Sequence, residues 1–86
     1  KHALRALAQS MARELGPQGI HVAHVVIDGA IDSQFIRENL PDADDRRARD
    51  GLLIPDEIAK NYVWLHRQHR SAWTHELDLR PWNETW

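Results

Sequence analysis

The chain opens with a strongly helical pattern of apolar positions. Within residues 1–15, apolar side chains recur at spacings of three and four, at Ala3, Leu4, Leu7, Ala8, Met11, Ala12 and Leu15. This spacing predicts an amphipathic helix, built largely from good helix formers. We expect Gly16 and Pro17 to end it, because glycine readily takes the left-handed C-terminal conformation and proline cannot continue the hydrogen-bond ladder.

A compact run rich in β-branched residues follows at residues 19–27 and predicts a strand. Strict alternation places Ile20 and Val22 on one face and Val25 and Ile27 on the other. Apolar residues on both faces are typical of a strand in a parallel sheet that is covered on both sides. A helix, a Gly-Pro turn and such a strand make half of a β-α-β unit, which favours an α/β fold.

The middle of the chain carries weaker signals. Residues 30–40 favour a short helix, capped by Asp32 or Ser33. Residues 41–51 are dense in Asp and Arg, and such a cluster is typical of a solvated loop or lid. We therefore expect a short helix followed by a polar loop.

The last third predicts a second long helix and a second strand. Pro55 opens the helix, and acidic residues in its first turn meet the positive end of the helix dipole. The side expected to be buried comprises Ile58, Ala59, Tyr62, Val63 and Leu65. Residues 74–79 alternate and predict a final strand before Pro81.

Length and charge limit the classes of function. Eighty-six residues make one domain at most, and a core of its own would be marginal. The absence of Cys excludes disulfides, thiolate metal sites and a Cys nucleophile. Eleven Lys and Arg against thirteen Asp and Glu leave a net charge of −2, and no apolar run approaches the length of a membrane span. We expect no nucleic-acid or membrane partner and, without a secretory leader pattern, a cytoplasmic protein.

The start of the chain indicates a fragment. The helical pattern begins at Lys1 with no initiator Met and no Ser, Thr, Asp or Asn cap before it. Helices normally begin with such a cap. We therefore expect the helix to continue one that starts upstream.

Several kinds of site find little support in the spacing of candidate residues. His66 and His69 are three residues apart on a predicted helix, but no third ligand stands at a matching spacing. We therefore expect no metal site, and a His-based metal carrier stays only as an alternative. No Ser, His and acid are arrayed as in a hydrolase triad, and no glycine-rich phosphate loop is present. The Trp residues are expected at a core edge or a subunit interface: Trp64, Trp73, Trp82 and Trp86.

The order of the motifs resembles the C-terminal third of the short-chain dehydrogenase/reductase family. The opening KHALRALAQSMARELGPQGIHV is similar to the family's stretch after its Tyr-x-x-x-Lys motif, with Lys1 as that lysine. The sequence GAIDS at residues 29–33 resembles the second half of the family's Pro-Gly-x-(Val/Ile)-x-Thr segment, and PDEIA at residues 55–59 resembles the start of its penultimate helix. THELDLRP takes the place of the final strand. The resemblance implies that residues 1–86 are the C-terminal segment of a single NAD(P)-binding domain, a doubly wound parallel-sheet Rossmann fold.

The resemblance also implies an activity and a site. The activity is hydride transfer between a nicotinamide cofactor, NAD or NADP, and a small carbonyl or alcohol substrate. Lys1 would lower the pKa of a catalytic Tyr one turn upstream and bind the cofactor's ribose, while the Ile31 backbone and the Ser33 hydroxyl would hold the nicotinamide carboxamide. Residues 34–54 would form part of a substrate lid. The other implied cofactor-binding positions are Ile27, Asp28 and Gly29.

Departures from the family pattern leave an alternative open. Asp28 or Ile27, depending on the direction of counting, stands where the family has Pro, and Ser33 replaces Thr. The family's glycine-rich dinucleotide turn, catalytic Ser and catalytic Tyr are not in this sequence, so we expect the isolated chain to be inactive and to bind dinucleotide poorly. The alternative is a non-catalytic remnant or an oligomerisation module, because this region commonly forms subunit contacts in the family. The complete protein is expected to be a homo-oligomer, a dimer or tetramer.

Overall fold

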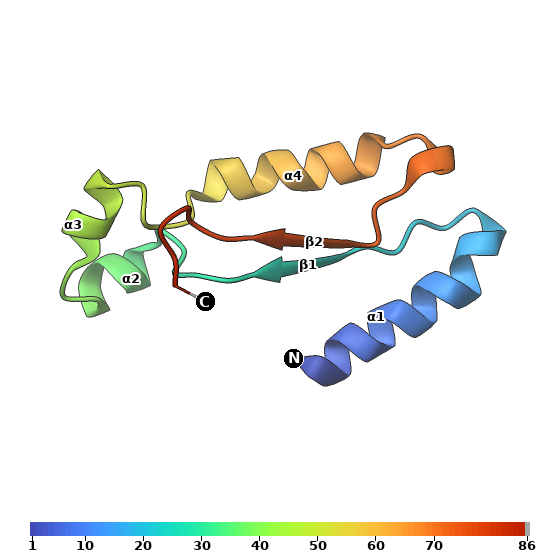
Figure 1. Ribbon diagram of the computed structural model, residues 1–86, viewed down its shortest axis with the longest axis horizontal. Helices are drawn as coiled ribbons and strands as arrows, with labels where there is room; N and C mark the ends of the chain where they lie inside the picture. The colour runs from blue at the N-terminus through green and yellow to red at the C-terminus, as the bar shows by residue number, and fades with distance from the viewer. Residues whose placement is uncertain (86) are drawn as a thin grey trace.

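A computed structural model describes residues 1–85 of the chain (Figure 1). Both long helices and both strands predicted from the sequence are present, in the predicted order. The elements are α1 His2–Leu15, a 3-10 turn Gly16–Gln18, β1 His24–Ile27, α2 Gln34–Asn39, α3 Ala43–Ala48, α4 Pro55–Arg67, a second 3-10 turn Arg70–Ala72 and β2 Glu76–Leu79.

The two strands form a small parallel sheet, as the sequence predicts. The register pairs His24 with Glu76 and Ile27 with Leu79. Both strands point toward α2 and α3, while α4 lies along one side of the pair and α1 along the other (Figure 1). The carboxyl ends of β1 and β2 therefore meet at the end of the molecule that carries the short helices.

One edge of β1 has no strand partner within residues 1–85. In a parallel pair, alternate residues direct their N–H groups to opposite edges. The N–H groups of His24 and Asp28 donate to β2-side carbonyls, at 2.7 Å to His75 and 2.9 Å to Leu79. Those of Val25 and Ile27 therefore point to the free edge.

The turn between α1 and β1 differs from the prediction. Gly16 is not left-handed, since its φ is −53°. Gly16 instead starts a 3-10 turn, with Pro17 in its first positions, that continues the helical winding. The chain reverses at Gly19, which has a φ of +83° and an N–H that donates to the Gly16 carbonyl at 2.9 Å. The strand begins only at His24, so the predicted strand over residues 19–27 is confirmed for its second half and was wrong for residues 19–23.

The Asp- and Arg-rich segment is helical at α3, and the prediction of a loop there was wrong. Asp44 and Asp45 lie in the first turn of α3, and Arg46 and Arg47 lie in its last turn. This order places each charge at the end of the helix dipole that stabilises it. The charge density that indicated a loop therefore supports a short helix.

Few side chains are buried, and the predicted apolar faces are largely open. Among residues 1–85 the buried hydrophobic side chains are Ala8, Ala43, Leu52 and Leu65. On α4 the prediction was right for Leu65, and Ile58 is half-buried. It was wrong for Ala59, which is exposed, and for Tyr62 and Val63, which are 52% and 46% exposed. The radius of gyration is 15.5 Å, whereas a compact chain of this length would have about 12 Å. The chain is therefore elongated, with uncovered helix faces. Within the described part, no helix combines the length and the apolar character needed to cross a membrane.

Candidate functional site

Lys1 stands at the start of α1, beside the free edge of β1. Its carbonyl accepts the first helical hydrogen bond, from the Arg5 N–H at 3.0 Å, and its side chain is exposed. Lys1 and Ile27 line the same pocket, whose volume is about 400 Å³. The structure thus brings together two of the residues that the sequence analysis placed in a site. The other lining residues are His2, Leu4, Arg5, His24, Val25 and Val26.

A two-pronged ion pair fixes this end of α1 to the sheet. Arg5 Nε donates to Glu76 Oε2 at 2.8 Å, and Arg5 Nη2 donates to Glu76 Oε1 at 2.6 Å. These bonds from the guanidinium hold the pKa of the Glu76 carboxyl below its ordinary value, with a smaller contribution from the nearby His24. Most apolar side chains of α1 are exposed, and this pair is a direct side-chain link between the start of α1 and β2.

The start of the turn after β1 is shaped by Asp28 and Gly29. The Asp28 N–H bond to the Leu79 carbonyl is one that a proline could not make. The ladder therefore runs one residue further, which accounts for the missing proline. Gly29 has a φ of +150°, and a Cβ there would lie 2.7 Å from Pro81 Cδ. Only glycine fits this close approach of the two backbones.

The backbone N–H of Ile31 points away from Leu53, the residue with which Ile31 pairs. Ile31 pairs with Leu53 as an isolated parallel bridge. The Leu53 N–H donates to the Ala30 carbonyl, and the Asp32 N–H donates to the Leu53 carbonyl, both at 2.8 Å. Because the groups on either side of Ile31 face Leu53, the Ile31 N–H points to the opposite side.

Ser33 supplies a second donor at the same turn. Its Oγ accepts a hydrogen bond from the Ile36 N–H at 3.3 Å, so Ser33, and not Asp32, caps α2. A hydroxyl that accepts one bond still has its hydrogen to donate. The Ile31 N–H and the Ser33 hydroxyl are therefore each able to donate a hydrogen bond to a ligand.

Asp32 lies between these two residues in the sequence and forms ion pairs with two arginines. Arg47 donates to both carboxylate oxygens, from Nε to Oδ2 at 3.0 Å and from Nη2 to Oδ1 at 3.1 Å. Arg37 Nε donates to Oδ1 at 3.2 Å. The Arg47 hydrogen bond, opposed by desolvation and reinforced by the two positive charges, lowers the pKa of Asp32. From the sequence, Asp32 is expected only as a helix cap. Nothing in the spacing pairs it with an arginine fifteen residues away.

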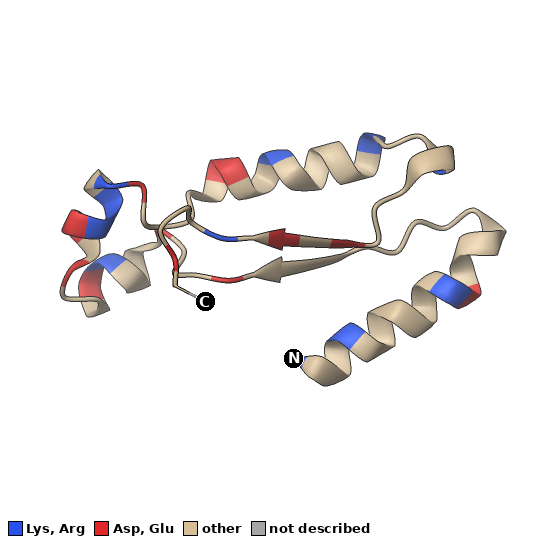
Figure 2. Cartoon of the chain, viewed as in Figure 1, with Lys and Arg blue, Asp and Glu red and all other residues tan. Residues whose placement is uncertain are grey.

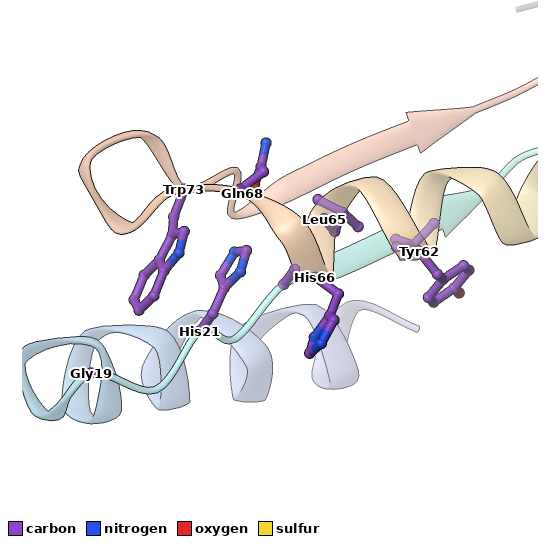
Figure 3. A pocket seen from close by; sticks show the side chains of 9 residues that line it. Gly19, His21, Tyr62, Leu65, His66, Gln68 and Trp73 are labelled. Carbon is purple, nitrogen blue, oxygen red and sulfur yellow. The ribbon is translucent and has the colours of Figure 1, made fainter.

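A second pocket, of about 420 Å³, lies beside the C-terminal half of α4 (Figure 3). The His21 ring stacks on Trp73 with centroids 4.6 Å apart, and its Nε2 is hydrogen-bonded to the Thr74 carbonyl at 2.7 Å. Tyr62 and His66 of α4 also line this pocket. None of the residues expected to bind the cofactor lines it, whereas His66, a member of the alternative metal site, does.

The remaining His and Trp residues form no further cluster in the part of the chain that the structure describes. There, no three His, Asp or Glu side chains are grouped closely enough to hold a metal ion, and His69 Nδ1 is hydrogen-bonded to Ser71 Oγ at 2.7 Å. Trp64 and Trp82 are 52% and 79% exposed. A role for the Trp residues at a subunit interface stays a prediction, and Trp86 lies outside the described residues.

Comparison with known proteins identifies one relative. No family model and no curated protein matches the chain. Among solved structures, the crystal structure of a short-chain dehydrogenase from Rhodopseudomonas palustris is similar, with 39% sequence identity and a TM-score of 0.56. The likeness covers 92% of this chain and 26% of that one, so this chain spans about a quarter of that protein's length. The resemblance inferred from the motifs is thereby confirmed, and the chain is related to the short-chain dehydrogenase/reductase family.

Proposed function

We propose that the chain is the C-terminal portion of an NAD(P)-dependent oxidoreductase. The enzyme transfers a hydride between the nicotinamide ring and the carbonyl or alcohol carbon of a small substrate. The observation that carries the proposal is the 39% identity to a short-chain dehydrogenase over 92% of this chain. In this proposal β1 and β2 belong to a doubly wound parallel sheet that continues at the free edge of β1.

Lys1 acts on the group that transfers the proton. A tyrosine with an ordinary pKa of ~10 is a poor base at neutral pH, and a nearby cation lowers that pKa by stabilising the phenolate. No carboxylate of residues 1–85 pairs with the Lys1 ammonium, so its charge is available for this task. Tyr62, the single tyrosine of the sequence, lies on α4 and outside the Lys1 pocket. The partner tyrosine would therefore come from a segment that precedes Lys1.

The turn after β1 orients the cofactor, whose nicotinamide ring supplies or accepts the hydride. The Ile31 N–H and the Ser33 hydroxyl would hold the carboxamide. Gly29 keeps this turn against Pro81, because no Cβ separates the two segments. Residues 34–54, which carry α2 and α3, leave directly from the turn and would cover the substrate.

The test compares the chain of 86 residues with a longer protein that includes the reading frame upstream of Lys1. Fluorescence titration with NADH and NADPH is expected to show micromolar binding to the longer protein but not to the chain of 86 residues. The longer protein is also expected to reduce small carbonyl compounds. Lys1→Ala is expected to lower kcat by about 100-fold or more, and Arg13→Ala, at the far end of α1, is the control. The proposal is overturned if the longer protein lacks a Tyr-x-x-x before Lys1 or binds neither dinucleotide.

A non-catalytic oligomerisation module is the second candidate. It is favoured by the exposure of apolar side chains on both long helices: Leu4, Leu7, Met11, Tyr62, Val63 and Trp64. Such surfaces are typical of interaction sites. A longer protein that forms a dimer or tetramer by light scattering but binds no dinucleotide would favour this candidate over the enzyme.

A further inference from the structure

We propose that Asp32 is a positioning residue, which fixes the lid (residues 34–54) to the turn that follows β1. The word lid rests on the proposed function. The inference depends on contacts within this chain, so it can be tested even in a protein that has no enzymatic activity.

Most ion pairs of the lid lie within a single helical turn. Figure 2 shows basic and acidic segments side by side over α2 and α3. Arg46 pairs with Asp42, and Arg49 with Asp45, each four residues apart. Such exposed local pairs support a short helix but attach it to nothing else.

The contacts of Asp32 are different, because they join separate elements. Arg47 reaches it from α3 and Arg37 reaches it from α2. The side chain of Asp32 is only 16% exposed, whereas Asp44, the other partner of Arg47, is 96% exposed. A bidentate pair that is partly buried is stronger and more directional than a single-bonded exposed one. Asp32 thus attaches both lid helices to the turn that follows β1.

The backbone of Asp32 holds the other end of the lid. Its N–H donates to the Leu53 carbonyl at 2.8 Å, just where the chain returns to α4. One residue therefore contacts the first helix, the second helix and the end of the segment. Ile31 and Ser33, the two proposed carboxamide contacts, are its immediate neighbours in the sequence. A shift of the lid would therefore move the donors that face the cofactor.

The test exploits the shape of the guanidinium. Lysine keeps the positive charge of Arg47 but cannot make the two-pronged contact. Arg47→Lys is therefore compared with Arg49→Lys, which makes the same change at an exposed pair at the C-terminal end of α3. Hydrogen–deuterium exchange of residues 34–54 is expected to be about fivefold faster in Arg47→Lys, with α4 unchanged and Arg49→Lys close to the wild type. Asp32→Asn, which removes the charge at constant shape, is expected to give the same acceleration.

Two readings separate this inference from the proposed function. In an active longer protein, Arg47→Lys is expected to raise the KM for the carbonyl substrate several-fold, while the Kd for the dinucleotide changes less than twofold. Faster lid exchange in a protein without dinucleotide binding would uphold the Asp32 attachment and refute the enzyme. Equal lid exchange in Arg47→Lys and Arg49→Lys would refute the attachment whatever the activity. If Asp32→Asn fails to fold, the two arginine variants still decide.

Discussion

Replacing Gly29 by alanine tests the close approach on which the turn after β1 depends. The φ of +150° at Gly29 is one that side-chain-bearing residues rarely adopt, and forcing it costs about 1–3 kcal/mol. The new Cβ would also lie 2.7 Å from Cδ and 3.3 Å from Cγ of Pro81, a buried residue whose ring cannot rotate away. Overpacking of this kind costs about another 1–3 kcal/mol. We therefore expect Gly29→Ala to lower the free energy of unfolding by about 2–6 kcal/mol.

Two other glycines separate the backbone cost from the packing cost. At Gly19 the φ is +83° and nothing lies within 4 Å of an added Cβ, so Gly19→Ala bears only the backbone cost of about 1 kcal/mol. At Gly16 the φ is −53° and the space is also open, so Gly16→Ala is expected to stabilise the chain by about 0.4–1 kcal/mol.

The assay is urea unfolding followed by tryptophan fluorescence. The urea concentration at the midpoint should be highest for Gly16→Ala and then decrease through the wild type and Gly19→Ala to Gly29→Ala. The dependence of the free energy of unfolding on urea concentration should be similar in all four proteins. If Gly29→Ala is no less stable than Gly19→Ala, the contact with Pro81 gives way at no cost and the argument for a close approach is refuted. The same variant in a longer, active protein should also weaken dinucleotide binding.

Two further predictions concern packing and pH. Leu65→Ala should lower the free energy of unfolding by about 2 kcal/mol in the same urea assay. This is near the low end for buried leucines, because the adjoining pocket lets the site relax. The control, Val63→Ala at a 46% exposed position, should change the free energy of unfolding by less than about 0.5 kcal/mol. The pKa of Glu76 is lower in the folded chain than its ordinary value of 4.5, so its pair with Arg5 contributes fully above that pH and is lost as the pH falls through the lower, folded value. Glu76→Gln should therefore flatten the loss of stability between about pH 5 and pH 2, measured as urea midpoints, and an unchanged slope would contradict this assignment.

The sequence alone determined the elements whose signal is local. The three- and four-residue spacing of α1, the proline and acidic first turn of α4 and the alternation of β2 all depend on residues within one or two turns of each other. The order of the motifs also carried the family resemblance and placed Lys1 and Ile27 in one site, where the structure finds them lining one pocket. Local signals failed at α3, because the same charges suit a solvated loop and a short helix with paired side chains.

Tertiary structure decided what depends on residues far apart in the chain. The pairing of Asp32 with Arg47, the closeness of Gly29 to Pro81 and the attachment of Arg5 to Glu76 have no periodic signal, because they arise only when the strand pair and its connections are packed. Periodicity predicted which face of each helix is apolar, but only the structure showed that Leu4 and Tyr62 lie exposed there. Amphipathic spacing reports the preference of a face for burial, whereas burial itself requires a neighbouring element to cover it.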